Sequence, residues 1–135
     1  VSSSGAPPRA IAVDASAFPD AVPALAALAM LAPEESSFSQ IGHLRLKESD
    51  RIASLEAVAA VVGAAARDAE GILFVSSGPG RSADTARVPT FRDHRIAMAA
   101  AILALRRPGV LIEDPGCVAK SYPGFFRDLE RLAVR

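Results

Sequence analysis

The charged residues that could do chemistry gather in two short segments of the 135-residue chain. The first reads His-Leu-Arg-Leu-Lys-Glu from His43 to Glu48, and Arg51 follows within one helical turn. The second reads Arg-Asp-His-Arg and covers residues 92–95. Clustered cations bind phosphate and carboxylate groups, and a carboxylate held among them can transfer a proton. The two segments therefore predict a site for an anionic molecule with a proton-transfer group beside it.

The first segment is expected to lie where a strand passes into a helix. From Ser37 to Leu46 apolar and polar residues alternate, which is typical of a strand. Leu44 and Leu46 would lie on one face of it, and the other face would carry His43, Arg45 and Lys47. A helix over 49–63 would follow, and acidic and capping residues are favoured at its start.

The second segment is expected at the start of a helix over 93–105, which Asp93 or Thr90 can cap. His94 and Arg95 would then lie at the positive end of the helix dipole. That position costs about 0.3–1 kcal/mol for each positive charge. An anion bound by these side chains and by free N–H groups would make the placement favourable.

Two further charges lie beside predicted helix starts. Asp20 begins a helix that ends before Pro33, and Lys120 stands three residues before Pro123, where the last helix is expected to begin. If these helix starts converge on one end of the domain, they form a pocket for phosphate or carboxylate. Asp20 and Glu48 would be available there for proton transfer.

Each of these residues also has an ordinary structural explanation. Lys47, Glu48 and Arg51 could form a solvated face with salt bridges. Asp20 could be only a helix cap, and Arg95 could be a surface cation whose stem packs on its neighbours. The residue types alone leave both explanations open.

The predicted elements alternate between strands and helices, which indicates an α/β or α+β fold. Strands are expected near 11–13, 37–46, 71–77 and 110–113, helices near 20–32, 49–63, 93–105 and after Pro123, and a loop over 78–88. The segments PDAVPALAALAML and DHRIAMAAAILAL both place an aspartate at the head of an Ala-rich helix. This similarity leaves an internal duplication open.

Composition excludes several classes of protein. Fifteen basic residues balance fifteen acidic ones, which argues against a general nucleic-acid binder. The single cysteine, Cys117, excludes an internal disulfide framework and a zinc site built from several cysteines, and we expect it to be a small buried residue. The apolar runs are too short to cross a bilayer, and no signal peptide opens the chain. We therefore expect one domain, or a piece of one, that is soluble and cytoplasmic.

Four segments resemble signature segments of the 5-enolpyruvylshikimate-3-phosphate synthase family, and they occur in the family's order. They are VDASAFPDAVPALAALA (13–29), LRLKESDRI (44–52), FRDHRIAMA (91–99) and DPGCVAKSYPGFF (114–126). The resemblance runs from Val13 to the C-terminus. It implies a two-domain enzyme in which each domain is built from repeated units of helices and a four-stranded mixed sheet. Residues 1–135 would be the C-terminal part of one domain, without the partner domain, and inactive or nearly so alone.

The resemblance also implies a reaction. The enolpyruvyl group of phosphoenolpyruvate is transferred to the 5-hydroxyl of shikimate 3-phosphate, and phosphate is released through a tetrahedral intermediate without a metal or organic cofactor. By the same resemblance Glu48 protonates the methylene carbon, Asp20 accepts the hydroxyl proton, and Lys47 contacts the hydroxyl and the intermediate. The division of proton transfer among these three residues stays open. The phosphoenolpyruvate-binding residues would be Arg51, Arg95 and Lys120, with His94 beside them.

The sequence departs from the family's pattern at His43, where many members have asparagine. An imidazole can still donate a hydrogen bond to a substrate hydroxyl or phosphate. Three alternatives remain: a related transferase acting on UDP-N-acetylglucosamine, a non-catalytic module that binds phosphate or carboxylate, and a structural α/β domain with solvated charges. The string Lys-Glu-Ser-Asp-Arg at 47–51 argues against the first of these.

Overall fold

The computed structural model describes residues 5–79 and 85–133 as two successive groups of elements. The first group is β1 (Ala12–Asp14), α1 (Val22–Ala29), β2 (Ser36–Ser39), α2 (Arg51–Val62), β3 (Ala65–Ala69) and β4 (Ile72–Ser76). The second is β5 (Ala86–Val88), α3 (His94–Ala104), β6 (Val110–Ile112) and α4 (Phe125–Ala133). Three 3-10 helices connect them: η1 (Pro19–Ala21), η2 (Gly42–Leu46) and η3 (Pro115–Lys120).

The strands form a four-stranded mixed sheet and a separate two-stranded sheet. The larger sheet has the order β1-β2-β4-β3, in which β1 is parallel to β2 and the other pairs are antiparallel. The smaller sheet pairs β5 with β6 in parallel. The expected α/β class and the expected four-stranded mixed sheet are therefore confirmed.

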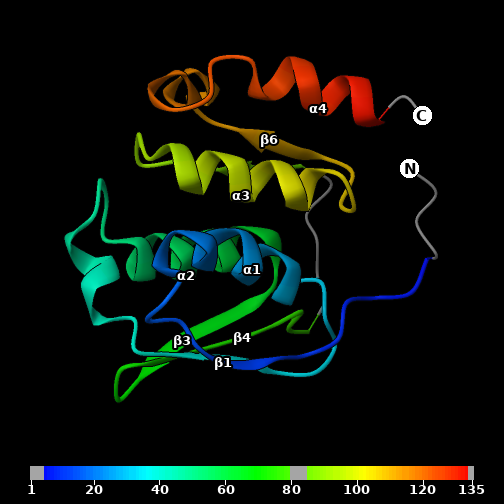
Figure 1. The fold of residues 1–135 in the computed structure, drawn as a ribbon. Helices are drawn as coiled ribbons and strands as arrows, with labels where there is room; N and C mark the ends of the chain where they lie inside the picture. Colours follow the sequence, from blue (N-terminus) through cyan, green and yellow to red (C-terminus); the bar gives the residue numbers. More distant parts are fainter. Residues whose placement is uncertain (1–4, 80–84, 134–135) are drawn as a thin grey trace.

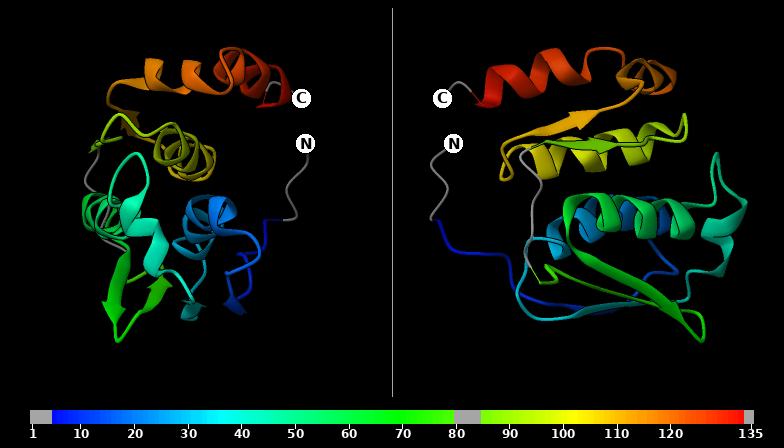
Figure 2. Two further views of the ribbon diagram at one scale, coloured as in Figure 1. Left: turned by 60° about the vertical axis from the view of Figure 1, so that its left-hand side comes forward. Right: turned by 180° about the vertical axis from the view of Figure 1, so that it is seen from behind.

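The elements are stacked in layers (Figures 1 and 2). Helices α1 and α2 cover one face of the larger sheet, α3 lies above them, and α4 lies at the opposite end of the molecule from that sheet. The main core lies between the larger sheet and the helices, with buried side chains from every layer up to α3. Phe38, Leu73, Leu55, Ile96 and Leu103 are among its members. The starts of α2 and α3 are thereby held in one packed body.

A strand–helix–strand unit with parallel strands occurs twice. It is formed first by β1, α1 and β2 and again by β5, α3 and β6. The two similar Ala-rich segments fall on α1 and α3, and these helices pack against each other. The structure therefore supports the internal duplication that the sequence left open.

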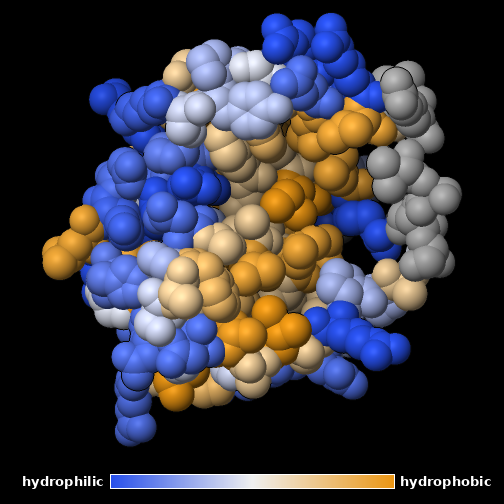
Figure 3. Space-filling view, viewed as in Figure 1, coloured by the Kyte–Doolittle hydropathy of each residue, from blue (hydrophilic) through white to orange (hydrophobic). Residues whose placement is uncertain are grey.

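The last helix is less buried than the sequence suggests. Its predicted apolar residues are Phe125, Phe126, Leu129 and Leu132, and none of them is buried. The two phenylalanines pack beside Cys117 and Val118 in a small second core, and Cys117 is buried as predicted. Apolar side chains gather on the face of α1, α3 and α4 (Figure 3), where a groove of about 450 Å³ is lined by Leu28, Leu31, Ile102, Leu105, Arg106, Leu129, Leu132 and Ala133.

The predicted strand over 37–46 is wrong in its second half. Strand β2 ends at Ser39, and Gln40 has a left-handed backbone with φ of 57° that turns the chain into η2. In a 3-10 helix the side chains repeat about every three residues, not every two. Leu44 is consequently buried, whereas the exposed fraction of Leu46 is 88%.

Two strands are absent from the sequence-based prediction. Strand β3 consists of Ala, Arg and Asp residues that have little preference for strands. Its pairing with β4 is set by the tight turn at Glu70 and Gly71, whose φ angles are 53° and 78°. Strand β5 falls inside the predicted loop over 78–88, part of which lies outside the described residues.

Helix α2 begins and ends as predicted. Asp50 caps it by accepting a hydrogen bond from the Ala53 N–H, and Gly63 ends it with φ of 74°. Within residues 5–79 and 85–133, no helix combines the length and apolar character that a membrane span needs.

Candidate functional site

Three basic side chains from three parts of the chain converge on the carboxylate of Asp20 in η1. Arg51 Nη1 donates to Asp20 Oδ1 at 3.1 Å, and Lys47 Nζ lies 3.8 Å from the same oxygen. Arg95 Nη2 lies 3.7 Å from Asp20 Oδ2. Asp20 itself is about half exposed, so this cluster opens to solvent. The sequence grouped these residues only because each lies near a predicted helix start. In the structure they share Asp20 as a common partner.

Arg51 forms the buried base of the cluster. It is the first residue of α2, and its side chain is 1% exposed. Its Nη2 donates to Glu48 Oε2 at 2.8 Å and to Asp93 Oδ1 at 3.2 Å, and its Nε donates to Asp93 Oδ2 at 2.9 Å. A guanidinium this deeply buried needs such partners, because an unpaired buried charge is strongly disfavoured. Arg51 therefore links Asp20, Glu48 and Asp93 into one network.

Asp93 joins the starts of α2 and α3. Its side chain is 0% exposed, and its Oδ1 accepts a hydrogen bond from the Arg95 N–H at 3.0 Å, which caps α3 as predicted. The same carboxylate accepts two bonds from Arg51 and one from Ser49 Oγ. The sequence predicted the cap but not the partnership with Arg51, since the two residues lie 42 positions apart. Two successive left-handed residues, Phe91 and Arg92, turn the chain so that Asp93 faces α2.

The surroundings shift the ionisation of these groups. Burial by itself would raise the pKa of Asp20, but the charges of Arg95 and Lys47 and the hydrogen bond from Arg51 hold that pKa below its usual value. Burial would likewise raise the pKa of Asp93, and hydrogen bonds from Arg51 and Ser49 lower it instead. Burial opposes the charge of Arg51, yet the bond to Asp93 raises the pKa of Arg51 above its usual value. All three groups are therefore ionised at neutral pH.

The structure corrects three expectations for this site. Arg51 is not part of a solvated face, since its side chain is buried and three carboxylates surround it. Asp20 makes no capping bond to the start of η1 or α1. At the start of α3, Asp93 already occupies one N–H group, so fewer free donors remain there for an anion.

The other three predicted site residues are His94, Lys120 and His43. His94 is buried as the first residue of α3, and its Nδ1 has no hydrogen-bond partner within the described ranges. The last helix, α4, follows Pro123 as predicted and begins at Phe125. Lys120 lies at the end of η3 and not in the first turn of α4. Lys120 Nζ lies 3.4 Å from the Arg92 carbonyl oxygen, close to the start of α3. His43 is exposed in η2, and its imidazole makes no hydrogen bond or ion pair with the residues described.

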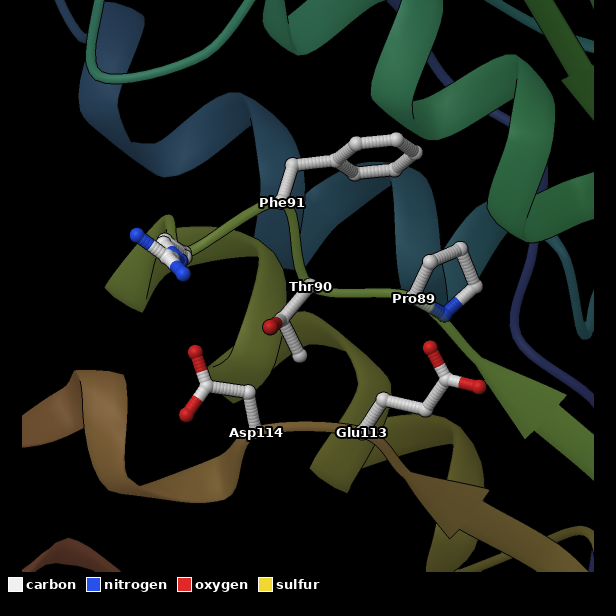
Figure 4. A pocket seen from close by; sticks show the side chains of 6 residues that line it. Pro89, Thr90, Phe91, Glu113 and Asp114 are labelled. Carbon is white, nitrogen blue, oxygen red and sulfur yellow. The ribbon is translucent and has the colours of Figure 1, made fainter.

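A separate pocket of about 460 Å³ lies beside the turn that precedes α3 (Figure 4). It is lined by Pro89, Thr90, Phe91, Arg92, Glu113 and Asp114. In Figure 4 the Glu113 side chain extends toward Pro89, the Asp114 side chain extends to the opposite side, and the Phe91 ring points away from both. None of the predicted site residues lines this pocket. It is a neighbour of the cluster and not part of it.

The charged groups of the cluster are of the types that bind anions and transfer protons. Lys47 and Arg95 are partly exposed beside Asp20, and Glu48 is exposed on the other side of Arg51. Partly exposed cations can bind phosphate and carboxylate groups, and the two exposed carboxylates can exchange protons with a bound molecule. Within the described part of the chain, no group of three or more His, Cys, Asp or Glu side chains is placed to hold a metal ion.

Comparison with known proteins gives consistent matches. The family model described as EPSP synthase (3-phosphoshikimate 1-carboxyvinyltransferase) matches residues 1–129. A 3-phosphoshikimate 1-carboxyvinyltransferase of Thermococcus kodakarensis is 45% identical over 125 residues, which cover 92% of this chain and 30% of that protein. One from Pseudomonas syringae pv. tomato is 39% identical over 125 residues, 90% of this chain and 30% of that protein.

A solved structure shows the same fold. The EPSP synthase of Acinetobacter baumannii superposes with a TM-score of 0.74 at 26% identity, covering 91% of this chain and 29% of that one. The chain thus spans about 30% of the length of the curated relatives reported above.

Proposed function

The chain belongs to the EPSP synthase family, and from that premise we propose that the protein containing it transfers the enolpyruvyl group of phosphoenolpyruvate to the 5-hydroxyl of shikimate 3-phosphate. Phosphate is the second product, and the reaction belongs to the shikimate pathway of aromatic amino-acid biosynthesis. The observation that carries this proposal is the convergence of Lys47, Arg51 and Arg95 on Asp20, with Glu48 on the same arginine.

Phosphoenolpyruvate carries a phosphate and a carboxylate, so its site needs several cations. Arg95 and Lys120 both lie near the start of α3, and Arg51 lies below them and joins α2 to α3. We assign these three residues to the two anionic groups of phosphoenolpyruvate. Guanidinium groups suit this task because their planar N–H donors match the oxygens of phosphate and carboxylate. His94 Nδ1, buried without a partner among the described residues, is a further polar atom at this helix start.

The addition step needs one base and one acid. The hydroxyl oxygen of shikimate 3-phosphate attacks C2 of phosphoenolpyruvate, its proton passes to Asp20, and C3 takes a proton from Glu48. Asp20 can accept the proton because the cations around it keep its carboxylate ionised, as its lowered pKa indicates. Lys47, whose Nζ lies 3.8 Å from Asp20, is placed to contact the same hydroxyl.

In the elimination step, C3 loses a proton again. The tetrahedral intermediate loses one hydrogen of its new methyl group to a carboxylate, and the bond from C2 to the phosphate oxygen breaks. The electron pair of the C–H bond forms the new C=C bond, and phosphate leaves with the pair of the broken C–O bond. The cations that bound the phosphate stabilise the charge it carries away. None of these steps requires a metal or an organic cofactor.

We also propose how the chain fits into the whole enzyme. Residues 1–135 would be the C-terminal part of one enolpyruvyl transferase domain, and the partner domain would supply most contacts to shikimate 3-phosphate. This agrees with the chain's share of its relatives' length, about 30%. The enzyme would work in the cytoplasm, a compartment that keeps a lone thiol such as that of Cys117 reduced.

The test is an assay of phosphate release from phosphoenolpyruvate in the complete enzyme that contains this chain. Release should require shikimate 3-phosphate, and Glu48→Gln should lower kcat by about 10²–10⁴-fold, the usual contribution of a general acid. Glu56→Gln is the matched control, because Glu56 lies on α2 but away from the cluster, and it should stay within about twofold of wild type. Binding of phosphoenolpyruvate without any turnover would favour the non-catalytic anion-binding module instead.

A further inference from the structure

We infer that Ser49 is a positioning residue: through Asp93, its hydroxyl fixes the orientation of the Arg51 guanidinium toward Asp20 and Glu48. The inference deepens the proposed function and rests on it, because Arg51 is assigned there to the binding of phosphoenolpyruvate. Within residues 5–79 and 85–133 the Ser49 hydroxyl bonds to Asp93 and Ser54 and to neither Asp20 nor the partly exposed cations, so its effect on substrate must pass through Asp93.

Ser49 and Arg51 share one oxygen atom of Asp93. Ser49 Oγ donates to Asp93 Oδ2 at 2.8 Å, and Arg51 Nε donates to the same atom at 2.9 Å. The serine lies two residues before Arg51 at the start of α2, whereas Asp93 stands at the start of α3. The hydroxyl therefore ties the carboxylate to the helix that carries the arginine.

The hydrogen of the Ser49 hydroxyl is directed toward Asp93 because an ionised carboxylate can only accept a hydrogen bond. Ser54 Oγ lies 3.1 Å from Ser49 Oγ and 2.9 Å from the Asp50 carbonyl oxygen, and its single hydrogen can go to either one. In both cases the Ser49 hydrogen stays available for Asp93. An ionised acceptor such as Asp93 makes this bond stronger than one between neutral groups.

Asp93 sets the plane of Arg51 because four donors hold its two oxygens. Oδ1 accepts from Arg51 Nη2 and the Arg95 N–H, and Oδ2 accepts from Arg51 Nε and Ser49 Oγ. With Ser49 removed, Oδ2 would keep only the arginine, and the carboxylate could rotate about its fixed bond to the Arg95 N–H. Since the guanidinium is a rigid plane, such a rotation moves its outer nitrogen atoms away from Asp20 and Glu48. The proposed function assigns those outer nitrogen atoms to a bound anion.

The test is Ser49→Ala in the complete enzyme, measured as KM and kcat for phosphoenolpyruvate. Arg51 holds anionic groups that are present in both substrate and transition state, so the variant should raise KM about tenfold and change kcat by less than about threefold. Ser49→Thr, which keeps the hydroxyl, should recover most of the affinity. Ser39→Ala is the matched control, because that half-buried hydroxyl donates to the Val13 carbonyl in the larger sheet and should leave KM unchanged.

A second measurement reads Arg51 directly if Ser49→Ala alters folding. With ¹⁵N-arginine in the enzyme, the Arg51 Nε–H resonance should shift and exchange faster with solvent in Ser49→Ala than in wild type. A KM that stays at the wild-type value, or that rises equally in Ser39→Ala, overturns the inference, as does an unchanged Nε–H resonance. A wild-type enzyme that releases no phosphate overturns the proposed function instead, so the two failures are distinguishable.

Discussion

Replacing Arg51 with methionine tests the buried ion pair at the base of the cluster. The substitution keeps most of the apolar stem and removes the guanidinium. Arg51 and Asp93 are 1% and 0% exposed, so the variant leaves a buried carboxylate without its cation. Breaking such a pair costs about 3–5 kcal/mol, a large part of the 5–15 kcal/mol by which ordinary domains are stable. We therefore expect Arg51→Met to lower the free energy of unfolding by about 3–5 kcal/mol at pH 7.

The difference in free energy of unfolding between the wild type and Arg51→Met should depend on pH in one specific direction. In the wild type the pKa of Asp93 is lowered, so its stabilising contribution is fully present above the unfolded pKa of about 3.9 and is lost only as pH falls through the lower folded value. In Arg51→Met burial remains without the cation, and the folded pKa of Asp93 should rise above the unfolded one. The variant then gains stability from this group as pH falls. The difference between the two proteins should therefore shrink between pH 7 and pH 4.

Urea unfolding followed by circular dichroism at pH 7 and pH 4 measures both quantities. Arg67→Met is the matched control, because the Arg67–Glu35 pair is exposed, with an N–O distance of 3.4 Å, and should cost about 1 kcal/mol or less. A loss below about 1.5 kcal/mol for Arg51→Met would refute the assignment of a buried pair. So would a difference that stays constant or grows on acidification.

Two further predictions concern the packing that holds the site. Arg107 donates to the carbonyl oxygens of Val62 and Met30, which lie at the ends of α2 and α1. Arg107→Met should therefore lower the free energy of unfolding, measured in urea, by about 1–3 kcal/mol. No loss would show that these bonds contribute nothing to stability. In η2, Leu44→Ala should cost about 2–5 kcal/mol and Leu46→Ala less than about 0.5 kcal/mol, because only Leu44 is buried. Equal losses would instead favour the strand that the sequence predicted.

The sequence predicted those parts of the fold whose signals are local. The helix predicted over 49–63 is α2, which Asp50 caps and Gly63 ends. For α3 the sequence offered Asp93 or Thr90 as the cap, and the structure selects Asp93. These signals depend on the hydrogen bonds of one helical turn, so neighbouring residues suffice to predict them.

The elements that the sequence missed depend on contacts made elsewhere. Alternation from Ser37 to Leu46 suits a strand, but Gln40 turns the chain and the following residues form η2. Strand β3 has weak strand preference and exists because β4 offers a paired edge across a two-residue turn. In both cases the tertiary arrangement overrides the local pattern.

The sequence predicted the members of the cluster around Asp20 but not their pairing. Residue types and helix positions identified Asp20, Lys47, Arg51 and Arg95, and the structure brings them together. Arg51 is the buried cation because it pairs with carboxylates that lie 31 and 42 residues away in the sequence. No pattern within one segment can specify such partners, so the sequence treated all the cations as equally available.

Burial divides the carboxylates of the cluster into two kinds. Asp93 accepts four hydrogen bonds and has no exposed surface, so its charge is neutralised by Arg51 and also caps α3. Asp20 is 53% exposed, and two of its three cations lie 3.7 Å and 3.8 Å away, beyond hydrogen-bond distance. An arriving phosphate or carboxylate can therefore compete with Asp20 for Lys47, Arg95 and Nη1 of Arg51, while the bonds from Arg51 Nε and Nη2 to Asp93 remain. An anion that draws these cations away from Asp20 raises the pKa of that carboxylate and makes it a stronger base.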